Sequence, residues 1–450
     1  MSGIISPGNS NPGNSIEQKT KFSDVPECIN DPAAPSEERV EALRGFVNGG
    51  GLALLPPFCG EINNHIHTIY SFSPYTPSMA ALKARQAGLE AAGSVDHDSY
   101  AAAEEMKAAT EILHMGCVTG LELRVSFRHT EFAERKINSP DSAGIAYMTI
   151  QGVPGGQADR IRDFLVLPGK ARQQRNRLMT ERLNGILSAA GLAELSYDRD
   201  IVPLSMAARG GSVTERHILY GLSLSLIQEA GKGETLLAFI KDRLDLAPSL
   251  KSAAMLSDGG NPFYAYDLLG LLKSSFNDRM YIQPDEDECP PVETVTGFAR
   301  SINAVPSYAY LGDVGESPTG DKKAEKFEDD YIEDLMPRLR SLGFLGVTYM
   351  PPRNTGEQLA RLHRLCEESG FIEISGVDIN SPRQGFNCPE IRKSEFAMLL
   401  DSTWALAAHE RLASADPGRG LFNPADPLAD RDLNERIKAF AEIGRRSIYG

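Results

Sequence analysis

Two histidines one residue apart, His65 and His67, lie in the stretch "EINNHIHTIYS" of a 450-residue chain that has eight histidines. Side chains alternate across a β-strand, so residues i and i+2 point to the same side. Two neutral imidazoles in this register can bind one metal ion. The same spacing also fits two separately hydrogen-bonded histidines at an exposed strand edge, so the interpretation depends on what other segments supply.

Other candidate ligands follow the predicted strands of the chain. Asp96, His97 and Asp98 stand together in "GSVDHDS", Glu122 lies in "TGLELR", and Asp378 lies in "ISGVDIN". Taken singly, each has an ordinary structural explanation as a capping acid, a hydrogen-bonded imidazole or a solvated carboxylate. Their recurrence at strand ends favours a metal site, and two imidazoles with two carboxylates suit Zn²⁺, Mn²⁺ or Fe²⁺.

The elements that must position these residues alternate between strand and helix. The strand "EINNHIHT" is followed by a helix that begins near Thr76 or Ser78, then by the strand "AAGSVDH", a second helix and the strand "CVTGLELRVSF". After a mainly helical stretch the alternation resumes with "AVPSYAYLGD", "GVTYMPPRN" and "FIEISGVDIN". This order predicts an α/β fold with a parallel sheet and crossover helices, closed or nearly closed into a barrel with functional groups at the C-terminal strand ends.

Composition changes along the chain predict four parts. The first residues are rich in Gly, Asn, Ser and Pro, which predicts a mobile arm, and "SEERVEALRGFVN" predicts a helix. The expected parts are an N-terminal arm and helix (1–55), the first part of the barrel (56–154), a mostly helical insertion (155–290), and the second part of the barrel with C-terminal helices (291–450).

Charge and cysteine content exclude several classes of partner. The formal net charge of -15 opposes binding to long nucleic acids and to anionic membranes. The six cysteines form no CxxC pair, which predicts reduced thiols and neither a disulfide framework nor a thiolate zinc site. No signal peptide and no membrane-spanning apolar run is recognised, so we expect a cytoplasmic protein. The sequence leaves the oligomeric state open.

Four motifs in the order "HIHTIYS", "SVDHDS", "GLE" and "SGVDIN" resemble the PHP (polymerase and histidinol phosphatase) superfamily. Members of that superfamily are metal-dependent phosphoesterases on a distorted seven-stranded β/α barrel. The resemblance runs from residue 61 to about residue 385, although only the motif segments are specific. It implies a distorted (β/α)7 PHP-type barrel interrupted by the helical insertion.

The resemblance also implies a ligand set for one to three divalent transition-metal ions (Zn, Mn or Fe). His65, His67, Glu122 and Asp378 would form the first metal site, with Glu122 bridging to a second ion. His97 would bind another ion, with Asp96 orienting its ring. His217 in "VTERHILYGL" resembles a metal-binding histidine of the subgroup that acts on nucleoside phosphates and small oligonucleotides.

The chain departs from that subgroup at several ligand positions. Phe72 stands where the subgroup has an aspartate, and Tyr310 and Asn380 stand where it has histidines. Near "AYMTIQG" only Tyr147 and Thr149 occupy the region of a further expected histidine. We therefore expect a complete first site and incomplete second and third sites. Two alternatives remain open: a hydrolase that uses a metal-activated water, and a diverged, non-catalytic metal- or ligand-binding barrel.

Arginines near predicted strand ends suggest how an anionic substrate is bound. Arg353 in "YMPPRN" and Arg383 in "INSPRQGF" carry planar guanidinium groups that suit phosphate or carboxylate. Lys322 and Lys323 are interpreted as solvated residues at a helix start. The predicted function is hydrolysis of a small phosphate ester, with His97, Asp96, Arg353 and Arg383 as the catalytic groups, a small anionic phosphorylated substrate, and no long nucleic acid or membrane as partner.

The remaining distinctive residues are interpreted as structural. Trp404 is predicted to lie in the core. The acidic segment "DEDECPP", which contains Glu288, is predicted to be a solvated loop. The other histidines are expected to be surface or hydrogen-bonded residues: His114, His129, His363 and His409.

Overall fold

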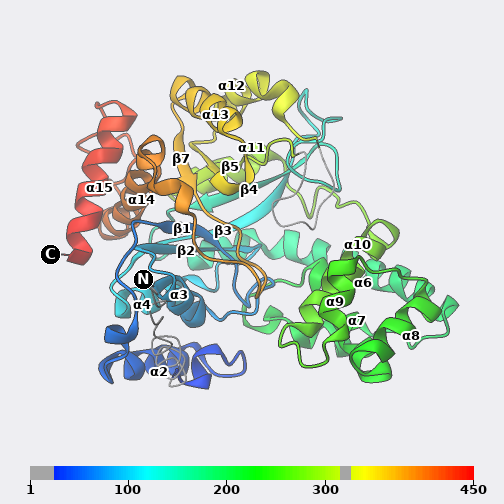
Figure 1. The fold of residues 1–450 in the computed structure, drawn as a ribbon. Coiled ribbons are helices and arrows are strands. Elements are labelled where there is room, and N and C mark those ends of the chain that lie inside the picture. The colour runs from blue at the N-terminus through cyan, green and yellow to red at the C-terminus, as the bar shows by residue number, and fades with distance from the viewer. Residues whose placement is uncertain (1–24, 315–325, 450) are drawn as a thin grey trace, which may run out of the picture.

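The sheet of the protein is a seven-stranded, nearly closed barrel whose strands follow one another in chain order (Figure 1). This computed structural model describes residues 25–314 and 326–449. The expected α/β barrel with a helical insertion is confirmed. The strands are β1 (Ile62–Ile66), β2 (Ala91–His97), β3 (Gly116–Ser126), β4 (Ile145–Gln151), β5 (Val305–Ala309), β6 (Gly346–Tyr349) and β7 (Ile372–Ser375).

One strand runs against the others. β4 pairs antiparallel with both β3 and β5, whereas the remaining neighbours are parallel. A parallel connection needs a crossover of a dozen or more residues, usually a helix. Residues 127–144, between β3 and β4, contain no helix, and the chain returns directly beside β3. The predicted parallel sheet with crossover helices is therefore present except at β4, which runs antiparallel for that reason.

The barrel closes between β1 and the segment that follows β7. Ile66 and Ile379 form an isolated parallel bridge. The backbone N–H of His67 donates to the Ile379 carbonyl at 2.9 Å, and the N–H of Ile379 donates to the His65 carbonyl at 3.1 Å. Because Asp378 precedes Ile379, closure brings this carboxylate beside both histidines of β1.

Helices cover the outside of the barrel and one of its ends (Figure 1). Trp404 is buried, as predicted, and packs near Gly116 at the start of β3. None of the helices in the described part of the chain is long and apolar enough to cross a membrane. The covering helices are α2 (Ser36–Asn48), α3 (Pro77–Gln86), α4 (Ala103–Ile112), α11 (Val292–Ser301), α12 (Ile332–Ser341), α13 (Gly356–Ser369), α14 (Ala397–Ala415) and α15 (Leu433–Tyr449).

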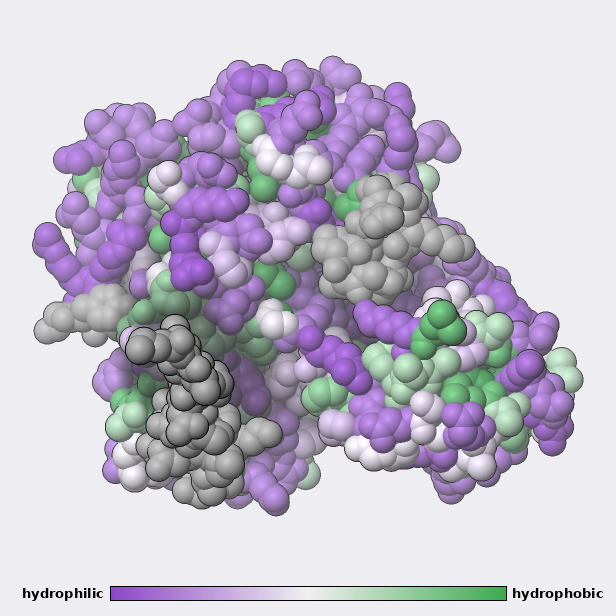
Figure 2. All heavy atoms as spheres, in the orientation of Figure 1, coloured by the Kyte–Doolittle hydropathy of each residue, from purple (hydrophilic) through white to green (hydrophobic). Residues whose placement is uncertain are grey.

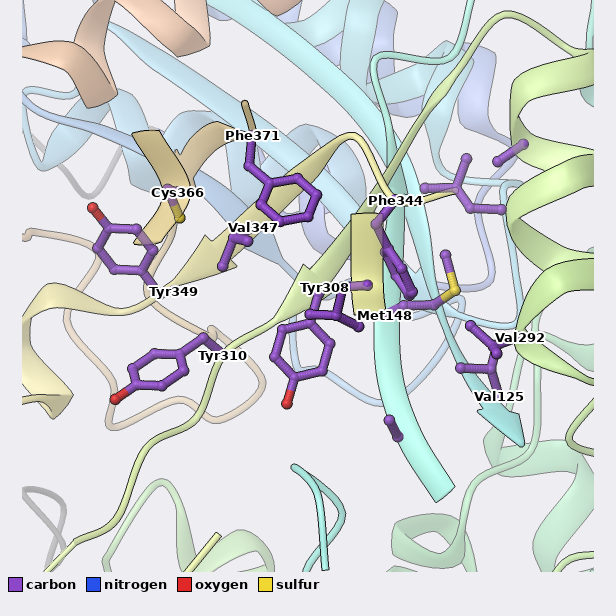
Figure 3. Packing of buried hydrophobic residues seen from close by; sticks show 14 of the residues in the cluster. Val125, Met148, Val292, Tyr308, Tyr310, Phe344, Val347, Tyr349, Cys366 and Phe371 are labelled. Carbon is purple, nitrogen blue, oxygen red and sulfur yellow. The ribbon is translucent and has the colours of Figure 1, made fainter. Parts of the chain in front are cut away.

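The largest apolar cluster joins the barrel to α11, α12 and α13. Figure 3 shows part of it: Met148 of β4, Tyr308 of β5 and Val347 of β6 pack with Val292 of α11 and with Phe344, which precedes β6. All five side chains are fully buried. Burying a large apolar side chain contributes roughly 1.5–3 kcal/mol. This packing therefore holds β4, β5 and β6 in place.

Helices between β4 and α11 form the insertion, which lies to one side of the barrel in Figure 1. It has an apolar core of its own. Figure 2 shows apolar spheres over these helices, and the exposed large apolar residues of the described chain all belong to this region: Val166, Leu167, Leu178, Leu204, Leu224 and Leu250. The helices are α5 (Ala158–Phe164), α6 (Val166–Ala189), α7 (Glu215–Ala230), α8 (Glu234–Leu244), α9 (Leu250–Ser257) and α10 (Tyr264–Met280).

Gly376 offers a test of the barrel closure. A Cβ added at Gly376 would lie 2.5 Å from both the backbone N and the Cβ of His65, whereas a Cβ added at Gly385 of the same segment would meet nothing within 4 Å. We expect Gly376→Ala to lower the free energy of unfolding by about 1–3 kcal/mol, the usual cost of overpacking. Gly385→Ala should leave it within about 0.5 kcal/mol of the parent, as surface changes do. Urea unfolding measures both, and equal stability of the two variants would contradict this packing.

Candidate metal centre

Three buried side chains meet here: His65 of β1, His67 directly after β1, and Glu122 of β3. His65, His67 and Glu122 each offer one ligand atom, and these atoms all lie within 4.8 Å of one another. The Nε2 atoms of His65 and His67 are each 3.6 Å from one oxygen of Glu122. Burial opposes a charged His65 ring, but the charge of Glu122 outweighs it and raises the pKa of His65. The alternation of β1 thus places both imidazoles on one side, as the spacing predicts.

The tautomer of His67 follows from its neighbours. The Ser71 hydroxyl donates its only hydrogen to Asp96 Oδ1 at 2.6 Å. Ser71 Oγ lies 3.3 Å from His67 Nδ1. Because its hydrogen is used by Asp96, Ser71 Oγ accepts the Nδ1–H of the His67 ring. A neutral imidazole has one N–H and one bare nitrogen, so His67 Nε2 carries a lone pair.

This lone pair faces carboxylates, which tests whether a metal ion fits. His67 Nε2 is buried without a hydrogen-bond partner. Its nearest charged atoms are Glu122 Oε2 at 3.6 Å and Asp378 Oδ1 at 3.4 Å. Ligands about 2.0–2.2 Å from a tetrahedral ion lie roughly 3.3–3.6 Å from one another. The donor types and separations of His65, His67 and Glu122 therefore fit a divalent ion, and the Asp378 carboxylate lies beside this group, next to His67.

His97 shares the same carboxylate. It is paired with Glu122 in the parallel register of β2 and β3, and its Nδ1 lies 3.1 Å from Glu122 Oε2. Its ring stacks on His67 with a centroid distance of 4.5 Å. Burial lowers the pKa of His97 well below its usual value. His97 is therefore a neutral imidazole at the edge of the centre.

Asp96 forms its hydrogen bonds with Thr68 and Ser71 and not with His97. The sequence predicted that it orients His97, but both of its oxygens accept hydrogen bonds from the loop after β1. The donors are Thr68 N, Thr68 Oγ1 and Ser71 Oγ, each at 2.6 Å. Burial raises the pKa of Asp96, and these donors oppose that shift. Asp96 consequently orients His67, through Ser71.

His217 is buried, but it is not among the residues that line the central cavity. Its Nδ1 accepts a hydrogen bond from Thr214 N at 3.0 Å, as part of the cap of α7. Its ring contacts Phe72 edge to face, with a centroid distance of 5.0 Å. Burial lowers the pKa of His217 to about 3. The structure thus gives this predicted ligand a helix-capping position.

The two arginines predicted to bind substrate also lie outside the cavity lining. Arg353 donates to the Leu311 carbonyl at 3.1 Å. Arg383 forms two hydrogen bonds of 2.6 Å to the carboxylate of Asp267 on α10. Arg353 therefore joins two segments of the barrel, and Arg383 joins the loop after β7 to α10 of the insertion. Lys322 and Lys323 lie outside the described residues, as do residues 1–24 of the arm that is predicted up to about residue 35.

A cavity of about 220 Å³ opens beside the candidate metal ligands. Its cationic lining comes from residues that the sequence analysis did not select: Arg124, Arg172, Arg216 and Lys273. The sequence held a signal for two of them. Arg124 is two residues after Glu122 and so shares its side of β3, while Arg216 directly precedes His217.

Much of this positive charge is already balanced by a buried network. Glu288 is 3% exposed and accepts hydrogen bonds from Arg124 and Arg175, so the prediction of a solvated loop was wrong. Burial alone would raise the pKa of Glu288, but the arginine charges lower it. Two further contacts complete the network: Arg172 to Asp98 and Arg175 to Glu215, both at 2.5 Å. Three arginines thus balance three carboxylates at the junction of barrel and insertion.

The positions where the family resemblance implies further ligands have other partners. Phe72 packs against Tyr220 and Tyr266 of the insertion, with centroid distances of 5.7 and 5.8 Å. Tyr310 donates a hydrogen bond to Asp329 at 2.6 Å. Burial, followed by this contact, raises the pKa of Tyr310, which keeps it a neutral donor. Tyr147 lines the cavity, with its ring centroid 5.8 Å from that of His97.

Comparisons with known proteins identify only distant similarity. No family model and no curated protein matches the chain. Among solved structures, a protein of Bifidobacterium adolescentis proposed to be a metal-dependent phosphoesterase is 17% identical, with a TM-score of 0.47 over 75% of this chain and 96% of that one. An amidohydrolase from Chromobacterium violaceum, with bound sulfate and no metal, is 15% identical, with a TM-score of 0.46 over 73% and 90% of the two chains. Similarity this distant carries no inference about activity.

Removing one imidazole should test the centre directly. We expect the protein to bind Zn²⁺, Mn²⁺ or Fe²⁺, and His67→Ala to weaken that binding at least about 100-fold, since partners outside the ligand shell already account for 10–100-fold. His129→Ala is the control, because His129 is an exposed histidine that also faces a carboxylate, Glu286, at 3.1 Å. Chelator competition and elemental analysis measure the effect. Equal metal affinity in the two variants would contradict the assignment.

Proposed function

We propose that this protein is a metal-dependent hydrolase of a small phosphate ester, with its ion held by His65, His67, Glu122 and Asp378. The observation that carries the proposal is the bare, buried Nε2 of His67, which faces two carboxylate oxygens and has no hydrogen-bond donor. A lone pair directed at negative charge is unfavourable unless a cation lies between them. The adjoining cavity offers room for a small substrate.

The residues around this centre suit hydrolysis. An ion bound there would supply a Lewis acid and lower the pKa of water. His97 lines the same cavity and is held neutral by burial, so its ring is unprotonated near pH 7, as a general base must be. Glu122 fixes His97 through the contact at 3.1 Å, and Asp96 fixes His67 through Ser71. The chain thus supplies both the ligands and a candidate general base.

The charges of the cavity favour an anion only when metal is present. Once the balanced arginine network is set aside, the lining holds the cations Arg216 and Lys273 against the carboxylates Glu122, Asp141 and Asp378. The formal net charge of these five lining residues is -1, and one bound divalent ion would change it to +1. Phosphate esters carry negative charge, so they fit the metal-loaded cavity and are repelled by the metal-free one.

Long nucleic acid fits this arrangement poorly. Binding a polyanion requires many cations along a groove, and two of the four cationic side chains that line this cavity, Arg124 and Arg172, already contact carboxylates. The chain also has a formal net charge of -15. A small ester needs only the ion and one or two cationic groups. Size and charge therefore both favour a small substrate.

The alternative is a diverged barrel that binds a metal or a ligand without turnover. It is favoured by the partners that Phe72 and Tyr310 have acquired at positions where the resemblance implies additional ligands. In that case the protein would bind an anion in the presence of metal and release no product. Measuring ester turnover together with binding of inorganic phosphate separates the two functions.

We expect metal-loaded protein to hydrolyse at least one member of a panel of phosphomonoesters, phosphodiesters and short oligonucleotides faster than a His65→Ala control. Lys273→Met should raise KM about tenfold without changing metal content, because a hydrogen bond to a charged group contributes about 1.5–3 kcal/mol. Lys241→Met, which removes an exposed lysine of α8, is the matched control and should leave KM unchanged. Binding of inorganic phosphate without turnover of any ester would replace the hydrolase by the non-catalytic function.

A further inference from the structure

We propose that Asn380 and Arg216 are positioning residues for the metal ligand Asp378, so that the helical insertion helps to set the geometry of the metal centre. This inference rests on the proposed function, since it takes Asp378 as a ligand. It assigns to Asn380 a role other than metal binding, although the residue stands where the family resemblance implies a histidine ligand.

A continuous chain of contacts connects the insertion to the metal centre. Arg216, in the first turn of α7, donates a hydrogen bond to Asn380 Oδ1 at 2.6 Å. Asn380 Nδ2 donates to Asp378 Oδ1 at 2.7 Å. The same oxygen of Asp378 lies 3.4 Å from the bare Nε2 of His67. The contacts thus run from Arg216 in the insertion, through Asn380 and Asp378 in the segment after β7, to His67 directly after β1.

The amide of Asn380 matches both of its neighbours. Its carbonyl oxygen accepts from a guanidinium that can only donate, and its NH₂ donates to a carboxylate that accepts. The two contacts together fix which end of the amide faces Asp378. The backbone N–H of Asn380 also donates to Gln384 Oε1 at 2.7 Å, which holds the residue in the loop. An apolar side chain of similar size would lose both side-chain contacts.

Asp378 needs such support more than the other proposed ligands do. Its side chain is 36% exposed, against 8% for Glu122 and 1% for His67. β7 ends at Ser375, so Asp378 follows the regular strand and its side chain is packed on fewer sides. A partly exposed carboxylate loses rotamer freedom when it binds an ion. A hydrogen bond that restricts the side chain beforehand reduces that cost.

Arg216 is itself held by well-fixed neighbours. Glu215 contacts Arg175 of the buried network at 2.5 Å, and His217 forms the cap of α7. The guanidinium also lies over the ring of Phe72, with 5.9 Å from its carbon to the ring centroid. Its position therefore depends on the docking of the insertion. Through Arg216 and Asn380 this docking reaches a metal ligand.

A second tether between the same loop and the insertion provides a matched control. Arg383 contacts Asp267 of α10 through two hydrogen bonds of 2.6 Å, a tether that is separate from the hydrogen bond between Asn380 and Asp378. Asp267→Asn weakens the tether while preserving the size of the side chain. General loosening of the loop would therefore affect Asp267→Asn as much as Asn380→Leu, whereas positioning of Asp378 would affect only the latter.

The experiment measures metal binding without substrate in full-length wild-type, Asn380→Leu, Arg216→Met and Asp267→Asn proteins. Zn²⁺ affinity is obtained by competition with a chromophoric chelator, and visible absorption of bound Co²⁺ reports the number and arrangement of ligands. We expect Asn380→Leu to weaken Zn²⁺ binding about 10–100-fold and to change the Co²⁺ spectrum. Arg216→Met should weaken binding about 2–10-fold, the effect of one hydrogen bond. Asp267→Asn should match the wild type in both.

Failure of the inference and failure of the proposed function give different results. If wild-type protein binds neither ion, the proposed function is wrong and this inference falls with it. If wild-type protein binds both ions, an unchanged Co²⁺ spectrum in Asn380→Leu, or an equal loss of affinity in Asp267→Asn, overturns the positioning role alone. Should Asn380→Leu fail to fold by circular dichroism, Arg216→Met decides, and wild-type affinity in that variant overturns the coupling to the insertion.

Discussion

Closure of the barrel by the pairing of β1 with Ile379 is the constraint on which the metal centre depends. The contact between the Asn63 side chain and the Val377 carbonyl joins residues 314 positions apart, and the neighbouring backbone bonds connect His65 and His67 to Ile379. The two histidines and Glu122 come from adjacent regions of the sheet, but Asp378 reaches them only when the two ends of the sheet meet. Ion binding and barrel closure should therefore stabilise each other, because a site that exists only in the folded state adds its binding energy to folding.

The junction between barrel and insertion obeys a second constraint, which is electrostatic. Arg124 of β3, Asp98 after β2, Arg172 and Arg175 of α6, Glu215 of α7 and Glu288 before α11 form a buried, balanced cluster. Desolvating such groups is costly, and removing one partner leaves an uncompensated charge. The cluster therefore fixes the insertion in one position. It also leaves little net positive charge in the cavity, so the proposed binding of an anion requires the proposed ion.

The sequence predicted the parts of the structure that local pattern determines. The strand "AAGSVDH" corresponds to β2, residues Ala91–His97, and the HxH register placed both imidazoles on one side. Contacts between distant segments could not be predicted in the same way. Asp96 has no sequence feature that selects Thr68 and Ser71 over His97. Arg383 looked available for phosphate because its partner, Asp267, lies 116 residues away on α10. Glu288 looked solvated within an acidic segment because its three arginines come from β3 and α6.

Phe72, Tyr310 and Asn380, which differ from the PHP motif that the sequence resembles, each have a specific side-chain partner in this structure. Phe72 packs on two tyrosines of the insertion, Tyr310 bonds to Asp329, and Asn380 joins Arg216 to Asp378. A side chain that merely lost a ligand atom would leave an unfilled or unsatisfied position, whereas each of these has a specific partner. Phe72 and Asn380 have partners in the insertion, whereas the partner of Tyr310 lies outside it. Phe72 and Asn380 thus connect the insertion to the segments beside the candidate metal centre.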